Sequence, residues 1–142
     1  MVAVNLTEPF FMSCAVLPTM LERPKGVIIN SASTLSFSAA GWGSGVYSGE
    51  ARGSGLTRQL PFEYGSKFAI CPGATATPME MADGASAPDM DAAIAQTPTG
   101  RWCQPKEVAK LASFPASDDT EFVHGSTYVI DGGGLTAARD AF

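Results

Sequence analysis

The feature that most constrains the fold is the run GVIINSAS at residues 26–33. Its apolar centre is continuous rather than alternating, and it is bounded by glycine and serines. Such a run is typical of a strand buried on both faces, as in a parallel sheet. Because parallel strands are joined by crossovers, usually helices, helices should precede and follow it. The predicted strand 26–32 therefore favours an α/β domain.

The remaining segments supply the alternation that this fold class needs. The N-terminal segment carries Leu6, Phe10, Cys14 and Leu17 at helical spacing, with Pro18 as an expected kink. We expect one domain over residues 1–142, with helices at 3–22, about 56–64 and 105–116, strands at 26–32, 68–71 and 126–130, and a long loop at 72–100.

Composition excludes several classes of function. The 142 residues carry a net charge of −5 and no cluster of Lys or Arg, so nucleic acid is not an expected partner. No apolar run reaches the roughly 20 residues of a membrane span, and no signal-peptide pattern begins the sequence, so we expect a cytoplasmic protein. With three dispersed cysteines and His124 as the only histidine, we expect reduced thiols and no metal site.

Three stretches together carry a family resemblance: GVIINSAS, PGATATPM at 72–79, and GRWCQPKEVAKLASFPASDDTEFVHGSTYVIDGG at 100–133. They resemble the short-chain dehydrogenase/reductase (SDR) family of NAD(P)-dependent oxidoreductases, which have a doubly wound Rossmann fold. The resemblance covers most of the chain but only the second half of the family's domain. It implies a partial Rossmann-like parallel sheet, with the nucleotide-binding half and its glycine-rich phosphate loop absent.

The resemblance assigns roles to five residues, each of which also has an ordinary reading. Ser33 would bind the substrate oxygen, and Asn5, 28 positions earlier, would complete a proton relay. The backbone around Pro72 and Gly73 and the hydroxyl of Thr77 would contact the nicotinamide of NAD or NADP. Without the resemblance, Ser33 would be a strand-end serine, Asn5 a helix cap, and Pro72–Gly73 a plain turn.

The family's catalytic Y-x-x-x-K motif is disrupted. Tyr47 lies 14 positions after Ser33, and the fourth residue after it is Ala51 rather than lysine. Counting without gaps places Val46 at the tyrosine position and Glu50 at the lysine position. A phenol needs a nearby cation to lower its pKa, and a carboxylate raises it instead. Tyr47 is therefore a catalytic candidate without its lysine.

A frameshift offers one hypothesis for this disruption. With suitable codons, Val46–Tyr47 and Glu50–Ala51 contain a tyrosine and a lysine codon in the second frame, which restores the motif in register. The original frame would resume by Leu56, and a second interruption would lie at 65–69. The glycines between residues 45 and 55 each disfavour a helix by about 1 kcal/mol, so we expect residues 39–55 to form a loop. Sequencing the gene tests the hypothesis.

Three functions follow from the resemblance. The first is an NAD(P)-dependent alcohol or ketone oxidoreductase, as a truncated or degraded copy with weak or no activity, acting on a small alcohol or carbonyl compound. The second is a non-catalytic oligomerisation partner, as a homo-oligomer or with an intact SDR paralogue. The third is a reductase that uses Tyr47 with Arg52 as its cation.

Overall fold

The computed structural model describes residues 3–23, 26–37, 57, 67–78, 94–95 and 97–136. Tyr47, the predicted loop at 39–55 and nearly all of the predicted helix at 56–64 lie outside these residues. The elements are a π-helix at Ala3–Thr7, α1 (Glu8–Leu21), β1 (Ile28–Ser31), a 3₁₀ turn at Thr34–Ser36, β2 (Lys67–Pro72), α5 (Pro105–Ser113), a 3₁₀ turn at Asp118–Thr120 and β3 (Ser126–Ile130).

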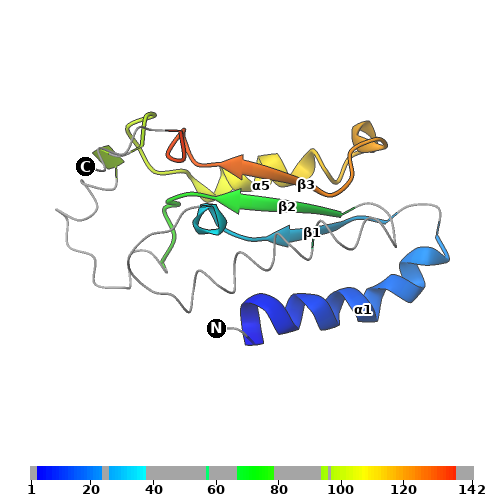
Figure 1. The fold of residues 1–142 in the computed structure, drawn as a ribbon. Coiled ribbons are helices and arrows are strands. Elements are labelled where there is room, and N and C mark those ends of the chain that lie inside the picture. Colours follow the sequence, from blue (N-terminus) through cyan, green and yellow to red (C-terminus); the bar gives the residue numbers. More distant parts are fainter. Residues whose placement is uncertain are drawn as a thin grey trace.

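The three strands form one parallel sheet in the order β1-β2-β3 (Figure 1). Ile29 of β1 pairs with Phe68, and Ile70 of β2 pairs with Tyr128. All three strands point the same way, so their carboxyl ends share one edge of the sheet. The predicted α/β class with a parallel sheet is confirmed.

The core is centred on β2, the middle strand of the described sheet. Phe68, Ala69 and Cys71 are fully buried and Ile70 is 3% exposed. This continuous burial explains the unbroken apolar run of the strand, because both of its faces are covered.

β1 is less buried than its apolar run alone indicates. Its first three residues are half-buried and Ser31 is exposed. The physical reason is its place at the edge: within the described residues, β1 pairs on one side only, with β2. An apolar run specifies a strand but not the position of that strand in the sheet.

The N-terminal helix differs from the prediction in its first turn. The predicted helix at 3–22 begins as the π-helix and becomes α-helical only at Glu8, followed by Pro9 in the first turn. Pro18 lies inside α1 without ending it.

The apolar residues at helical spacing in this helix do not share one buried face. Leu17 is buried as expected, but its buried neighbour is Ser13, whereas Phe10 and Cys14 are exposed. Apolar side chains surround almost the whole of α1, so the 3.6-residue period could not identify the inward face.

The C-terminal helix is shorter than predicted. The sequence predicts a helix over 105–116, whereas α5 ends at Ser113. Pro115, two residues later, has no N–H to donate to a helical carbonyl. The chain then forms a 3₁₀ turn capped by Ser117, whose Oγ accepts from the N–H of Asp119. β3 follows at Ser126–Ile130, and β2 is one residue longer at each end than the predicted 68–71.

Candidate functional site

The carboxyl edge of the sheet gathers segments that are distant in sequence. Ser33 follows β1, Gly73 follows β2 and Asp131 follows β3. Because the carboxyl ends of the three parallel strands share one edge of the sheet (Figure 1), these segments belong to the same edge. Open α/β sheets bind ligands outside the carboxyl ends of their strands. This edge is therefore the candidate site.

Ser33 caps the short turn after β1. Its backbone is extended (φ −148°, ψ 157°), and its Oγ accepts from the N–H of Leu35 at 3.2 Å. The cap occupies one acceptor lone pair of the hydroxyl, so its O–H donor can still be directed at another group. Ser33 is half-buried.

Of the two other catalytic candidates, only Asn5 lies in the part of the chain that the structure describes. Asn5 lies in the N-terminal π-helix, half-buried, and no hydrogen bond links its side chain to Ser33 within the described part of the chain. Tyr47 lies outside the described residues. Their roles in a proton relay therefore stay predictions.

Gly73 lets the ends of β2 and β3 approach closely. Its N–H donates to the carbonyl of Ile130 at 3.0 Å. A Cβ at this position would lie 2.8 Å from Asp131 Cβ and 3.0 Å from Asp131 Cα. Only glycine fits here without displacing the backbone of the neighbouring strand end.

The segment after Gly73 is held by the residues that precede α5. The N–H of Cys103 donates to the carbonyl of Ala74 at 3.0 Å, and the N–H of Ala76 donates to the carbonyl of Cys103 at 2.9 Å. Thr75 Oγ1 donates to the carbonyl of Gly73 at 2.9 Å. These bonds fix the chain up to Thr77, the predicted cofactor contact, which is half-buried.

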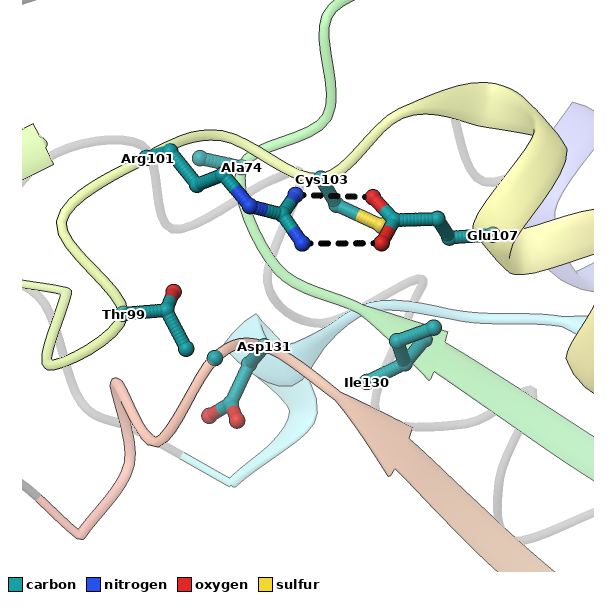
Figure 2. Close-up of a pocket in the computed structure, with 8 residues that line it drawn as sticks. Ala74, Thr99, Arg101, Cys103, Glu107, Ile130 and Asp131 are labelled. Atoms are coloured by element: carbon teal, nitrogen blue, oxygen red, sulfur yellow. Dashed lines mark hydrogen bonds and ion pairs between the residues drawn. The ribbon is translucent and has the colours of Figure 1, made fainter.

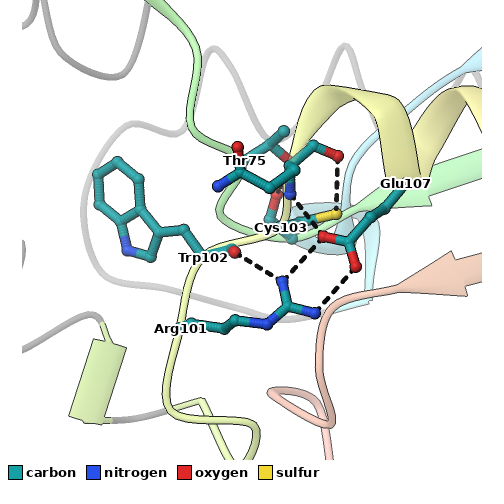
Figure 3. Close-up of polar contacts among 7 residues, drawn as sticks. Thr75, Arg101, Trp102, Cys103 and Glu107 are labelled. Atoms are coloured by element: carbon teal, nitrogen blue, oxygen red, sulfur yellow. Dashed lines mark hydrogen bonds and ion pairs between the residues drawn. The ribbon is translucent and has the colours of Figure 1, made fainter.

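An ion pair joins Arg101 to Glu107 in the first turn of α5 (Figure 3). The guanidinium of Arg101 donates to both carboxylate oxygens of Glu107, at 2.8 and 2.9 Å, and also to the carbonyl of Trp102 at 3.1 Å. The N–H of Gln104 donates to the same carboxylate at 2.8 Å. The hydrogen bonds from Arg101, with that from Gln104, lower the pKa of Glu107 to about 2, and the bond to Glu107 raises the pKa of Arg101.

The sequence pattern indicates Glu107 as an acidic residue in the first turn of the helix that begins at Pro105, but it does not identify Arg101 as the partner of Glu107. The detectable signal was an arginine four residues before the helix-initiating Pro105, within reach of an acidic residue in the first turn.

A cavity of about 140 Å³ lies among these segments (Figure 2). Burial raises the pKa of the Cys103 thiol that lines it, so this thiol is mostly protonated at neutral pH. The cavity is bounded by the strand ends and by the Arg101–Glu107 pair; its lining residues are Ala74, Thr99, Arg101, Cys103, Glu107, Ile130, Asp131 and Gly132.

Trp102, which precedes α5, and His124, at the opposite, amino end of β3, have structural surroundings. Trp102 is 8% exposed, in agreement with a packing role. His124 contacts the carbonyl of Glu121 through Nε2 at 3.0 Å, in the turn before β3. Among the described residues, no three His, Cys, Asp or Glu side chains gather as a metal site would require, and none of the helices there has the length and apolar character of a membrane span.

The low pKa of Glu107 predicts a stabilisation that depends on pH. A carboxyl whose pKa falls on folding stabilises the folded state above its unfolded value, near 4.5, and this contribution is lost as the pH falls toward 2. We expect Glu107→Gln to reduce the loss of stability between pH 5 and about 2. Urea denaturation across that pH range measures the free energy of unfolding, with the exposed Glu22→Gln variant as control. An equal loss of stability on acidification for Glu107→Gln and the unmodified chain would contradict the prediction.

Comparison with known proteins agrees with this geometry. A family described as enoyl-(acyl carrier protein) reductase matches residues 1–134. The chain is 38% identical over 139 residues to dehydrogenase/reductase SDR family member 6 of Danio rerio, covering 92% of this chain and 57% of that protein. It is 33% identical to 2-(S)-hydroxypropyl-CoM dehydrogenase 3 of Xanthobacter autotrophicus, covering 92% and 54%.

A solved structure matches the fold over nearly the whole chain. The gluconate 5-dehydrogenase of Burkholderia cenocepacia, crystallised with NADP and tartrate, superposes with a TM-score of 0.89 at 30% identity. The match covers 94% of this chain and 54% of that one. The chain thus spans about half the length of the relatives that it matches. It belongs to the short-chain dehydrogenase/reductase family.

Proposed function

We propose that this chain carries the substrate and nicotinamide side of an NAD(P)-dependent oxidoreductase that transfers hydride between the cofactor and a small alcohol or carbonyl compound. The observation that supports it most is that Ser33 follows β1 while Pro72 and Gly73 end and follow the neighbouring parallel strand β2, so that they share the carboxyl edge of the sheet in a chain of this family. We also propose that the isolated 142-residue chain has little or no oxidoreductase activity.

The residues at this edge fit a nicotinamide. Pro72 ends β2, and the hydrogen bonds from Cys103 hold the following backbone, so Thr77 is presented from a fixed segment. A ring bound there would meet a rigid backbone rather than a mobile loop, which favours one orientation. When bound, NAD(P) supplies the hydride acceptor or donor. In our proposal Ser33 orients the substrate oxygen, and Pro72, Gly73 and Thr77 hold the carboxamide.

Proton transfer is the weak part of the site. In the ungapped register, Val46 and Glu50 stand where the family has tyrosine and lysine. A phenol with a pKa near 10 transfers protons poorly at neutral pH unless a cation lowers that pKa. Neither Val46 nor Glu50 can supply this chemistry, which supports low activity.

The pyrophosphate side of the cofactor has no assigned place in this chain. The glycine spacing G-x-x-x-G-x-G occurs once, at residues 49–55 (GEARGSG). A phosphate loop of this type follows a buried strand and opens a helix, so that the anion lies at the helix N-terminus. The preceding residues, SGVYS, lack the apolar run of such a strand. We therefore do not assign residues 49–55 to phosphate binding.

A hybrid enzyme tests the proposed function. The part of the Burkholderia cenocepacia gluconate 5-dehydrogenase that this chain does not match would be joined to residues 1–142. We expect the hybrid to bind NADP without turnover on small alcohols and ketones. Adding Val46→Tyr and Glu50→Lys should produce measurable turnover, because a general acid–base group contributes about 10²–10⁴-fold to the rate. Ser33→Ala in that background should remove the gain.

Two results would contradict this account. Turnover by the hybrid before the two substitutions would show that the chain already holds its proton-transfer groups. Reductase activity of the 142-residue chain with Val46→Tyr and Glu50→Lys alone would show that no further nucleotide-binding part is needed.

The exposed apolar side chains of α1 favour a second function, as a non-catalytic partner in a homo-oligomer or with an intact SDR paralogue. Phe11 is 64% exposed, Met12 59% and Val16 39%. Glu8, in the first turn, is the acidic residue of α1, and the two buried side chains of the helix, Ser13 and Leu17, are uncharged. A helix that is apolar on nearly all sides is normally covered by protein. Co-purification with a full-length paralogue would support this function.

We expect the isolated chain to self-associate at tens of micromolar, because exposed apolar surface on this scale drives association. Sedimentation velocity measures it. Phe11→Lys with Met12→Lys should shift the chain toward monomer, because two charges on this helix would have to be desolvated on association. The control is Phe122→Lys, at a fully exposed position in the turn before β3. A monomeric unmodified chain, or an equal effect of the control, would contradict the prediction.

A further inference from the structure

Two segments distant in sequence are interlocked at the carboxyl edge of the sheet. The N–H of Thr99 donates to the carbonyl of Gly132 at 3.2 Å. The turn that contains Gly132 is held by Asp131, whose carboxylate accepts from the N–H of Gly133 at 2.9 Å and from the N–H of Leu135 at 2.7 Å. Thr99 and Asp131 lie near each other at the cavity in Figure 2. A rigid turn therefore holds the Thr99 segment.

Gly132 is packed where a side chain would have no room. Its φ is +63°, and a Cβ added there would collide with Thr99 Oγ1 and lie 2.7 Å from Thr97 Cγ2. Gly100 provides a natural comparison, because its φ is +66° but no atom of the described residues lies within 4 Å of its Cβ position. The two glycines have the same backbone requirement, and only Gly132 also has a packing requirement.

The segment held by Gly132 leads directly into the rest of the site. Two residues after Thr99, Arg101 makes the ion pair with Glu107. Cys103 then forms backbone hydrogen bonds with Ala74 and Ala76, in the segment that follows β2. Thr99, Arg101 and Cys103 all line the cavity, as does Gly132 itself. A shift of residues 97–101 would therefore change the wall of the cavity.

We propose that Gly132 is a positioning residue: its missing side chain lets residues 97–101 lie against the end of β3, and this fixes the wall of the cavity that Cys103 lines. The link to the cofactor rests on the proposed function, because Cys103, which follows this segment, also holds the backbone after Gly73 that leads to Thr77. The positional claim itself is independent of any activity.

The thiol of Cys103 reports on this position. The Cys14→Ser substitution removes the exposed cysteine, and Cys71 is fully buried. In this background, a thiol reagent such as 5,5′-dithiobis(2-nitrobenzoate) labels Cys103. We expect Gly132→Ala to increase the labelling rate of Cys103 about tenfold. The added methyl group would overpack the contact between position 132 and residues 97–99, which favours local opening of this segment. The matched Gly100→Ala has the same backbone strain without the collision, and should change the rate less than about twofold.

Second-site substitutions distinguish the effect of the steric collision at position 132 from the effect of backbone strain there. Thr97→Ser and Thr99→Ala remove the atoms that meet a Cβ at position 132 and keep the Thr99 N–H. Added to Gly132→Ala, they should return the labelling rate to that of Gly100→Ala. Equal rates for Gly132→Ala and Gly100→Ala, or no rescue, would overturn the proposal. Because labelling needs neither cofactor nor turnover, its result is independent of the hybrid-enzyme test.

Discussion

Replacing Phe68 by alanine should lower the free energy of unfolding by about 3–5 kcal/mol, the usual loss for a large aromatic side chain in a core. Phe68 is fully buried in β2, the middle strand of the described sheet. Its ring centre lies 6.1 Å from that of Tyr128 on β3. The truncation therefore removes apolar contacts and leaves a cavity that the flanking strands cannot fill.

Urea denaturation measures this loss, and the chain contains a matched control. Phe122 is 100% exposed, so Phe122→Ala should change stability by less than about 0.5 kcal/mol. Against a typical domain stability of about 5–15 kcal/mol, the Phe68 variant should be largely or partly unfolded. A loss below about 1.5 kcal/mol would mean that β2 is not the centre of the core.

The second large effect is expected at Gly73. Gly73→Ala should destabilise the fold by about 1–3 kcal/mol, as overpacking does at a filled position. The new Cβ would lie 3.0 Å from Asp131 Cα, a backbone atom, so no rotamer change can relieve the contact. The strand ends would have to separate, which would also weaken the bond from the Gly73 N–H to Ile130.

Gly134→Ala is the control for this substitution. Gly134 lies in the turn after β3, and the atom nearest to its Cβ position is Asp131 O at 3.4 Å, an ordinary contact. We expect its stability to change little, or to rise slightly because alanine restricts the unfolded chain. If Gly73→Ala and Gly134→Ala have equal denaturation midpoints, the close approach at Gly73 is not a constraint on the fold.

The parallel α/β fold could be predicted because its signals are local. Unbroken apolar runs mark β1 and β2, and Pro105 with Glu107 marks the start of α5. Burial could not be predicted in the same way. Whether β1 lies inside the sheet or at its edge depends on which strands pair with it, and α1 is too uniformly apolar for its period to reveal the inward face.

The site was predictable only in part, for a related reason. Ser33, Pro72 and Gly73 follow predicted strands, so the rule that carboxyl ends meet at one edge was sufficient to place them. The pairing of Arg101 with Glu107 and the contact of Gly132 with Thr99 are tertiary contacts. They depend on how a loop returns to the sheet, which no local pattern encodes.

The central claim is that this chain holds the nicotinamide side of the family's cofactor site without the pyrophosphate side. An NMR titration of the ¹⁵N-labelled 142-residue chain with NADPH tests it most directly. We predict small amide shift changes confined to Ser33, Gly73, Thr77 and their neighbours, without saturation below about 100 μM, equivalent to a binding free energy weaker than about −5.5 kcal/mol. Saturation at lower concentrations, or shifts centred on another part of the chain, would contradict the claim.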